Sequence, residues 1–171
     1  MKRRFFDFLR IHNNPEPTLS NGSYEDVYDT TKTLLEKAKF NMDKHKISVA
    51  YRIGKLNRSK NTPRPIIVKM LKRSSRNSIM RQQKTNMREN AEFQSTYNKV
   101  FITEDLTKLR QYISYKLRID KEKIDKTWSI NGTTKCTLKE NPTDIVTIDT
   151  PFDLKRINWT DKQIRELLRE H

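Results

Sequence analysis

Basic side chains that could bind phosphate groups are concentrated in one stretch of the sequence. Between Arg52 and Arg88 there are twelve Lys or Arg residues and no Asp or Glu. The whole chain of 171 residues has 36 basic and 21 acidic residues, a net charge of +15. Charge concentrated in this way is typical of proteins that bind polyanions. A solvated basic surface without a partner is the simpler alternative, and the clustering favours a polyanion partner over it.

The candidate nucleic-acid contacts are ten of the twelve cations of this stretch and one lysine further along the chain. They are Arg52, Lys55, Arg58, Lys60, Arg64, Lys69, Lys72, Arg73, Arg76, Arg81 and Lys116. Cations attract phosphates without regard to sequence, whereas single strands are also held by stacking of bases on aromatic rings, at about 1–3 kcal/mol per base. The ring candidates are Phe6, Phe8, Tyr51, Tyr112, Tyr115 and Trp128. For each ring, packing in a hydrophobic core is an equally good interpretation.

Residue patterns that carry catalysis or bind metals are missing. Three glycines provide no Gly-rich phosphate loop, and the three histidines are scattered singly, without zinc-ligand spacing. Glu104 and Asp105 lie at a predicted helix start, where capping explains them. The single Cys136 fits a half-buried strand residue better than a nucleophile, and it suits a reducing compartment. We therefore predict a non-enzymatic protein with no cofactor and no metal.

The sequence shows no segment that inserts into a membrane. No apolar run of about 18 residues occurs, and Asp7 and Arg10 interrupt the apolar part of the N-terminal segment. We predict neither a signal peptide nor a membrane span. The expected location is intracellular, as a cytoplasmic ribonucleoprotein, with the nucleus as the alternative.

The elements that position these residues follow the order strand, helix, strand, strand, helix, strand between residues 5 and 103. The predicted segments are a strand at 5–11, a helix at 23–40 capped by Ser23, strands at 47–54 and 66–71, a helix at 76–90 capped by Ser74 or Ser75, and a strand at 98–105. In the second strand, Ile47, Val49, Tyr51 and Ile53 are expected on one face. The helix at 76–90 has a thin apolar stripe, made by Ile79, Met80 and Met87, between basic faces.

This order predicts an α+β fold in which residues 1–104 form an RRM-like ferredoxin domain, βαββαβ, with four antiparallel strands on one side and two helices on the other. RNA-recognition domains use this layout, and their stacking rings lie on the first and third strands. The expected third strand, 66–71, has no ring. Such a domain would be atypical, and its binding would depend on cations.

Residues 105–171 predict a smaller α+β domain. A helix from near Asp105 has an apolar stripe, and a hairpin is expected around Asn131-Gly132, which is a strong turn signal. A third strand at 144–150 and a short helix from Pro151 to Ile157 follow. Thr160 and Gln163 fit a capping box for the last helix. The apolar stripe of the first helix consists of Leu106, Leu109, Ile113 and Leu117.

Several motifs occur in a familiar order: Arg-Ile-Gly, a basic gap, "PRPIIVK", a strand ending in Asp-Leu-Thr, an arginine in the next helix, and Trp-x-x-Asn-Gly. This pattern, over about residues 5 to 157, resembles the nucleic-acid-binding region of the first open-reading-frame proteins of LINE retrotransposons. It is also similar to the related C-terminal domain of baculovirus few-polyhedra (FP) proteins. The resemblance implies that both domains clasp single-stranded RNA. The implied contacts are Arg52, Arg64, Lys69, Arg110 and Trp128.

The resemblance also implies a role. The retrotransposon proteins coat their RNA and act as nucleic-acid chaperones, and they trimerise through an upstream coiled coil. This chain contains no coiled-coil heptads, so a trimer is expected only if a coiled coil lies outside it. We therefore predict a single-stranded RNA or DNA binder and chaperone in a retrotransposon or viral particle. The alternative is an FP-type viral structural or regulatory protein that acts through protein partners.

Overall fold

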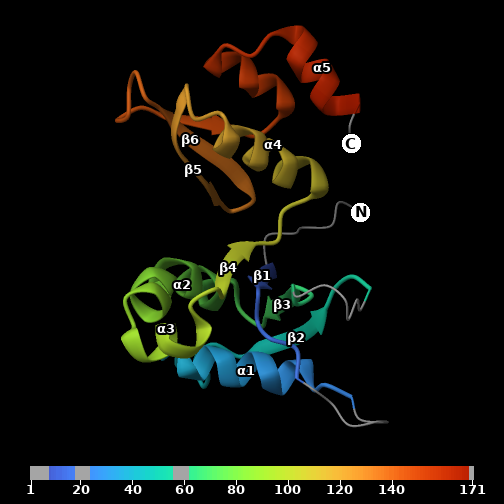
Figure 1. Cartoon of the computed structure of the whole chain (residues 1–171), viewed down its shortest axis with the longest axis vertical. Coiled ribbons are helices and arrows are strands. Elements are labelled where there is room, and N and C mark those ends of the chain that lie inside the picture. The colour runs from blue at the N-terminus through green and yellow to red at the C-terminus, as the bar shows by residue number, and fades with distance from the viewer. Residues whose placement is uncertain (1–7, 18–23, 56–61, 170–171) are drawn as a thin grey trace. The chain divides into compact units, whose positions relative to one another are not determined.

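The computed structural model describes residues 8–17, 24–55 and 62–169, and the chain divides into two compact units, Met1–Asp105 and Leu106–His171 (Figure 1). Each unit combines helices with one antiparallel sheet. The α+β class predicted from the sequence is therefore confirmed. The candidate contacts Arg58 and Lys60 and the ring candidate Phe6 lie outside the described residues.

The sheet of the first unit has the strand order β2-β3-β1-β4, and every neighbouring pair is antiparallel. The strands are β1 (Phe8–His12), β2 (Ile47–Arg52), β3 (Ile66–Met70) and β4 (Phe101–Glu104). The chain runs from β1 to β2 through one helix and from β3 to β4 through a helical segment. Each of these connections therefore joins two parallel strands that have a third strand between them.

Helices pack against one face of this sheet (Figure 1). They are α1 (Val27–Lys37), α2 (Arg73–Gln83), its π-helical continuation η2 (Lys84–Arg88), and α3 (Ala91–Tyr97). Between the helices and the sheet lies the first core, where apolar side chains alternate along each strand with residues of the opposite face. The core includes Leu9, Ile11, Leu34, Leu35, Ile66, Val68, Met70, Ile79, Met87, Phe93 and Ile102.

Helix starts differ from the predicted ones. α1 begins after Asp26, whose carboxylate accepts from the backbone N–H of Asp29, rather than at Ser23, which lies outside the described residues. α2 begins at Arg73 with Lys72 as N-cap and no side-chain cap. Neither Ser74 nor Ser75 caps it, because these serines lie inside its first turn. Several polar residues near the start of a helix can serve as its N-cap. Composition alone therefore locates the first residue of the helix only to within one turn.

Strand β2 contains a bulge that the sequence pattern did not indicate. Ile47 pairs with Met70 and Val49 pairs with Lys69, so Ser48 is an extra residue without an opposite partner. A bulge of this kind shifts the alternation of faces by one position. Ile47 consequently faces the core, whereas Val49 and Tyr51 face the opposite side, and the prediction that they share one face with Ile47 is wrong.

The second unit has a three-stranded sheet in the order β5-β6-β7 and helices that enclose its own core. Its elements are α4 (Lys108–Ile119), β5 (Ile124–Ile130), β6 (Thr133–Leu138), β7 (Ile145–Ile148), the 3₁₀ helix η3 (Pro151–Ile157) and α5 (Asp161–Arg169). α4 begins after Thr107 instead of near Asp105, because the Thr107 hydroxyl accepts from the backbone N–H of Arg110. Ile113 and Leu117 are buried in this core, and Cys136 is fully buried there.

Local signals in the second unit are confirmed. Asn131 and Gly132 have φ values of 54° and 78°, as the tight turn of a β5–β6 hairpin requires. Pro151 occupies the first turn of η3. Thr160 and Gln163 form the predicted capping box, with the Gln163 side chain accepting from the Thr160 N–H at 2.9 Å.

Candidate nucleic-acid interface

The face of the first sheet that points away from the helices carries aromatic rings and a lysine. We call it the outer face. It consists of the strand residues that alternate with the core residues: Phe8, Arg10, His12, Val49, Tyr51, Ile67, Lys69, Phe101 and Thr103. Because Ser48 is extra to the pairing, Tyr51 reaches this face, where it lies opposite Ile67.

Cross-strand pairing arranges these side chains in rows across the sheet. One row contains Val49, Lys69 and Phe8, in neighbouring strands β2, β3 and β1. The Lys69 ammonium lies 5.8 Å from the centre of the Phe8 ring, close enough for a cation–π contact. A strand rises about 3.3 Å per residue, so Phe8 and His12, four residues apart on β1, lie about 13 Å from each other. The rings are therefore spread over the face rather than packed into one cluster.

Three ring positions of this face are open to solvent or half-open. Tyr51 is 45% exposed and Phe101 is 40% exposed. His12 stacks on Phe101 with ring centres 4.4 Å apart and planes 6° apart, and its Nε2 lies 3.0 Å from the Thr103 hydroxyl. Exposed flat rings on a sheet are surfaces on which bases can stack. Sequence reasoning missed Phe101, although the alternation in "VFIT" places it opposite to buried Ile102.

Arg10 lies in the middle row of the outer face and is neutralised by a carboxylate. Its Nε donates to Asp105 Oδ1 at 3.0 Å, and the two side chains are 19% and 14% exposed. Asp105 was expected to cap a helix, and this prediction is wrong because α4 begins three residues later. Lys69 is therefore the outer-face cation that extends over a ring, and it was among the predicted contacts.

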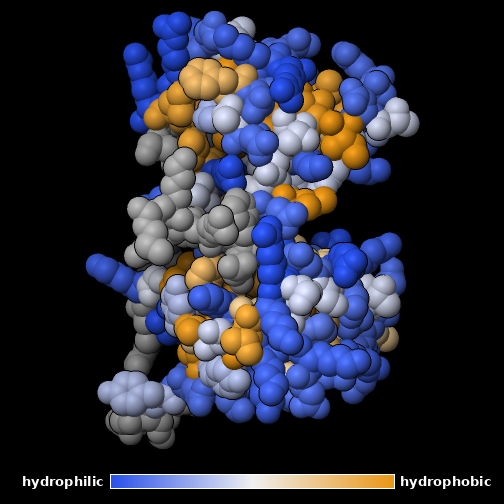
Figure 2. All heavy atoms as spheres, turned by 180° about the vertical axis from the view of Figure 1, so that it is seen from behind, coloured by the Kyte–Doolittle hydropathy of each residue, from blue (hydrophilic) through white to orange (hydrophobic). Residues whose placement is uncertain are grey.

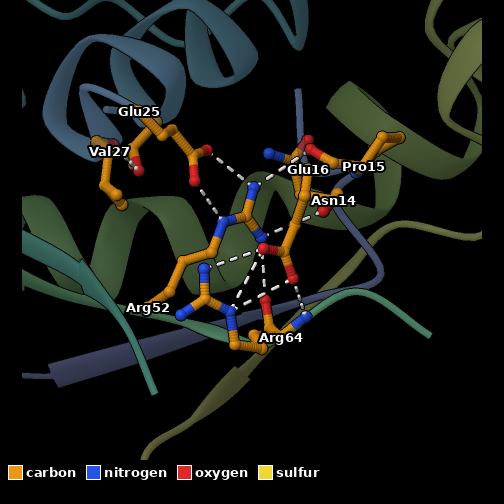
Figure 3. A network of polar contacts seen from close by, with 8 residues as sticks. Asn14, Pro15, Glu16, Glu25, Val27, Arg52 and Arg64 are labelled. Atoms are coloured by element: carbon orange, nitrogen blue, oxygen red, sulfur yellow. Dashed lines mark hydrogen bonds and ion pairs between the residues drawn. The ribbon is translucent and has the colours of Figure 1, made fainter. Parts of the chain in front are cut away.

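Arg52 does not lie on the outer face. Its side chain is 2% exposed and forms a double ion pair with Glu25, at 2.6 and 2.8 Å (Figure 3). The remaining N–H groups donate to the carbonyls of Asn14, Pro15 and Arg64 at 2.8 to 3.1 Å. An arginine has five N–H donors, and all five are used here. Arg52 thus ties the β1–α1 loop, the start of α1 and the β2–β3 loop together, and it has no donor left for phosphate.

Arg64 is engaged in the same region. Its guanidinium contacts Glu16 at 2.8 and 3.1 Å, and its backbone N–H donates to the same carboxylate at 2.8 Å (Figure 3). These hydrogen bonds from Arg64 hold the pKa of Glu16 below its ordinary value, and in turn the pKa of Arg64 is raised. The predicted contact is therefore an internal ion pair that is partly open to solvent.

We expect Glu16 to make the stability of the protein depend on acid pH. A carboxyl whose folded pKa is lowered contributes stability above its unfolded pKa of about 4.3, and the contribution is lost as the pH falls through the lower folded pKa. Glu16→Gln should therefore be less stable than the wild type at pH 7 and should lose less stability on acidification. Urea titrations at neutral and acid pH measure both differences. Equal losses in the two proteins on acidification would contradict this role for Glu16.

Arg76 is also internal. Its side chain is 3% exposed and is ion-paired with Glu104, which is 4% exposed. It comes from the buried side of α2, and Glu104 comes from the core side of β4. The interpretation of Glu104 as a helix-capping residue is wrong, and Arg76 is placed far from solvent. Three arginines of the acid-free stretch thus find acidic partners elsewhere in the sequence: Glu25, Glu16 and Glu104.

Five other candidate cations, all in the described part of the stretch, are on the surface. Lys55, Lys69, Lys72, Arg73 and Arg81 are exposed. Figure 2 shows one face of the molecule, where hydrophilic residues (blue) make up most of the surface and hydrophobic areas (orange) are small. Of the candidates in the described part of the stretch, these five are the ones that can reach a nucleic acid without breaking a buried ion pair.

In the second unit, Arg110 has a structural contact that the sequence did not predict. Its guanidinium donates to the carbonyl of Gly132 at 2.6 Å and to that of Asp149 at 3.4 Å. It therefore joins α4 to the hairpin turn and to the end of β7. Lys116 lies on the same helix, with its ammonium 4.9 Å from the centre of the Tyr112 ring.

Trp128 is half-buried and lies on the sheet face away from α4. It pairs directly with Lys135, whereas the neighbouring Thr134 points to α4, where its hydroxyl lies 2.8 Å from that of Ser114. Successive residues of a strand point to opposite faces, so Lys135 and Trp128 share the face that points away from the helix. The alternative that Trp128 packs on the helix is not what the structure shows.

Comparison with known proteins adds no relative: no protein-family model matches the chain, and no curated protein matches it significantly. None of the helices that the structure describes has both the length and the apolar character that crossing a bilayer requires. Within residues 8–17, 24–55 and 62–169, no group of three or more acidic, His or Cys side chains is placed to hold a metal ion.

Proposed function

We propose that the protein is a non-enzymatic binder of single-stranded nucleic acid, with RNA as its ligand, and that the outer face of the first sheet is its stacking surface. The observation that carries the proposal is the set of exposed rings on a sheet face opposite the helices, beside Lys69, in a chain with a net charge of +15. Stacking gives sequence-tolerant affinity, and the charge adds a salt-dependent attraction to phosphates.

The first unit is, in this proposal, an RRM-like ferredoxin domain. Support comes from the element order and from the strand order β2-β3-β1-β4. The rings differ from the usual arrangement on the first and third strands. Here Tyr51 lies on β2, and His12 stacks on Phe101 across β1 and β4, so β3 contributes Ile67 and Lys69 between the rings. Coating of RNA and chaperone activity are the role that such sequence-tolerant binding serves.

We expect Tyr51→Ala and Phe101→Ala each to weaken binding of a single-stranded RNA by about 1–3 kcal/mol. Each removes one stacking ring. Fluorescence anisotropy with a labelled, unstructured oligouridylate measures the change in affinity. A second, unrelated sequence should show the same loss of affinity, because stacking does not depend on the identity of the base.

Tyr28→Ala is the matched control. Tyr28 is 43% exposed, close to the 45% of Tyr51, but it lies on α1, on the helical side of the unit. This variant should bind RNA like the wild type. If Tyr51→Ala and Phe101→Ala also bind like the wild type while folded, the outer face is not the binding surface. If the wild type binds no single strand near physiological salt, the protein acts through protein partners instead.

A further inference from the structure

The first unit carries a basic surface on its helical side, apart from the outer face. Arg73, Arg81, Lys84 and Arg88 follow one another at spacings of eight, three and four residues along α2 and η2. Residues at such spacings share one face of a helix. All four side chains are exposed. We call these four residues the basic helix surface.

This surface points away from the sheet. The opposite side of the same helix buries Ile79 and Met87, which are 0% and 2% exposed, in the core against the strands. A helix with its side chains is about 10–12 Å thick. The helical layer therefore separates the basic helix surface from the outer face, and one short extended segment of nucleic acid cannot contact both.

The outer face carries few of the cations that the structure describes in the first unit. Residues 1–105 contain 22 basic and 11 acidic residues, so this unit holds +11 of the net charge of +15. On the outer face, Arg10 is paired with Asp105, and Lys69 is the cation that lies over a ring. A strand stacked there consequently meets few of the described cations of the unit.

Three cations of the basic helix surface, Arg81, Lys84 and Arg88, are at most weakly engaged by acids. Among the described residues, Arg81 and Arg88 have no ion-pair partner, and Lys84 has a pair with Glu89 at 3.4 Å in which both side chains are largely exposed. Exposed pairs of this kind contribute little and are readily exchanged. The surface also includes a π-helical turn, η2, which carries Lys84 and Arg88; such turns are rare and are frequent at functional sites.

We infer that the basic helix surface binds the phosphate backbone of a second nucleic-acid strand, so that one first unit bridges two strands. The inference rests on the proposed function, because the outer face must hold the first strand. Charge without rings gives contacts that are independent of base identity and sensitive to salt. Two strands held on one domain meet at a raised local concentration, which gives a chaperone its means of bringing strands together.

The test uses the full chain and two non-complementary oligouridylates, one with a donor dye and one with an acceptor dye. We expect energy transfer between them when protein is added at low salt, and its loss in Arg81→Gln/Arg88→Gln. Binding of one strand at limiting concentration should weaken at most threefold in this variant, because the outer face is intact. Sedimentation of both proteins checks that their state of association is the same.

The outcomes separate the two proposals. The bridging inference is wrong if the wild type binds one strand but shows no energy transfer between two strands. It is also wrong if Arg81→Gln/Arg88→Gln shows the same energy transfer as the wild type. If the basic helix surface instead binds vesicles containing phosphatidylserine and no energy transfer occurs between strands, the bridging inference is wrong as well. If the wild type binds neither strand, the proposed function itself fails. Tyr51→Ala/Phe101→Ala should lose one-strand affinity and energy transfer together.

Discussion

Arg52→Ala should lower the free energy of unfolding by about 3–5 kcal/mol, the range for removing one partner of a buried ion pair. The change leaves the Glu25 carboxylate, 9% exposed, without its bidentate partner, and it removes the donors from three backbone carbonyls. Urea denaturation followed by circular dichroism measures the loss. At a temperature where the variant is folded, its affinity for single-stranded RNA should match that of the wild type.

Two further variants show whether the network itself is the cause. Arg52→Lys should recover only part of the loss, because an ammonium cannot replace a planar fork with five donors. Glu25→Ala/Arg52→Ala should cost less than the sum of the two single changes, since they remove one shared interaction. If Arg52→Ala is as stable as the wild type but binds RNA more weakly and with a flatter salt dependence, Arg52 contacts phosphate, as the resemblance implies.

Arg76→Met and Glu104→Leu should each destabilise the protein by about 3–5 kcal/mol, whereas the double variant should be neutral or more stable than the wild type. Each single change removes the ion-pair partner of the other charge in a site that is 3–4% exposed. Among the residues that the structure describes, Arg76 Nε has no hydrogen-bond partner, so the pair is incompletely compensated. Apolar side chains in both positions would remove the cost of burying either charge.

Chemical denaturation of the three variants provides the measurement, and Lys32→Ala provides the control. Lys32 and Glu36 form a pair at 3.9 Å in which both side chains are about half exposed, so its loss should cost no more than about 0.5 kcal/mol. A double variant that is as unstable as the single ones would mean that the charges make further contacts that stabilise the unit.

Structural features that depend only on residues close together in the sequence were predictable. The Asn131-Gly132 turn, the position of Pro151 and the Thr160–Gln163 capping box depend on residues within a few positions of one another, and all three are confirmed. The order of the strands was also predictable, since hydrophobic periodicity is read within each element, but the helix α3 between η2 and β4 was not predicted.

Long-range pairing was not predictable in the same way. The acid-free stretch suggested that its arginines face a ligand, but the partner of Arg52 lies 27 residues upstream and that of Arg64 lies 48 residues upstream. Nothing in the local pattern distinguishes an arginine with a distant acidic partner from one at the surface. Arg110 shows the same limit, because its acceptors are backbone carbonyls that only the fold brings near.

The bulge at Ser48 has a consequence for changes in chain length. Deleting Ser48 would leave Ile47 opposite Met70 and Val49 opposite Lys69, so each side chain would keep its face. If Ala50 were deleted instead, the extra residue Ser48 would enter the regular pairing. Ser48 would then point to the outer face, and Val49 would point to the core side. Tyr51 would stay opposite Ile67 in both cases. Strand β2 can therefore lose either Ser48 or Ala50 while Tyr51 stays on the outer face.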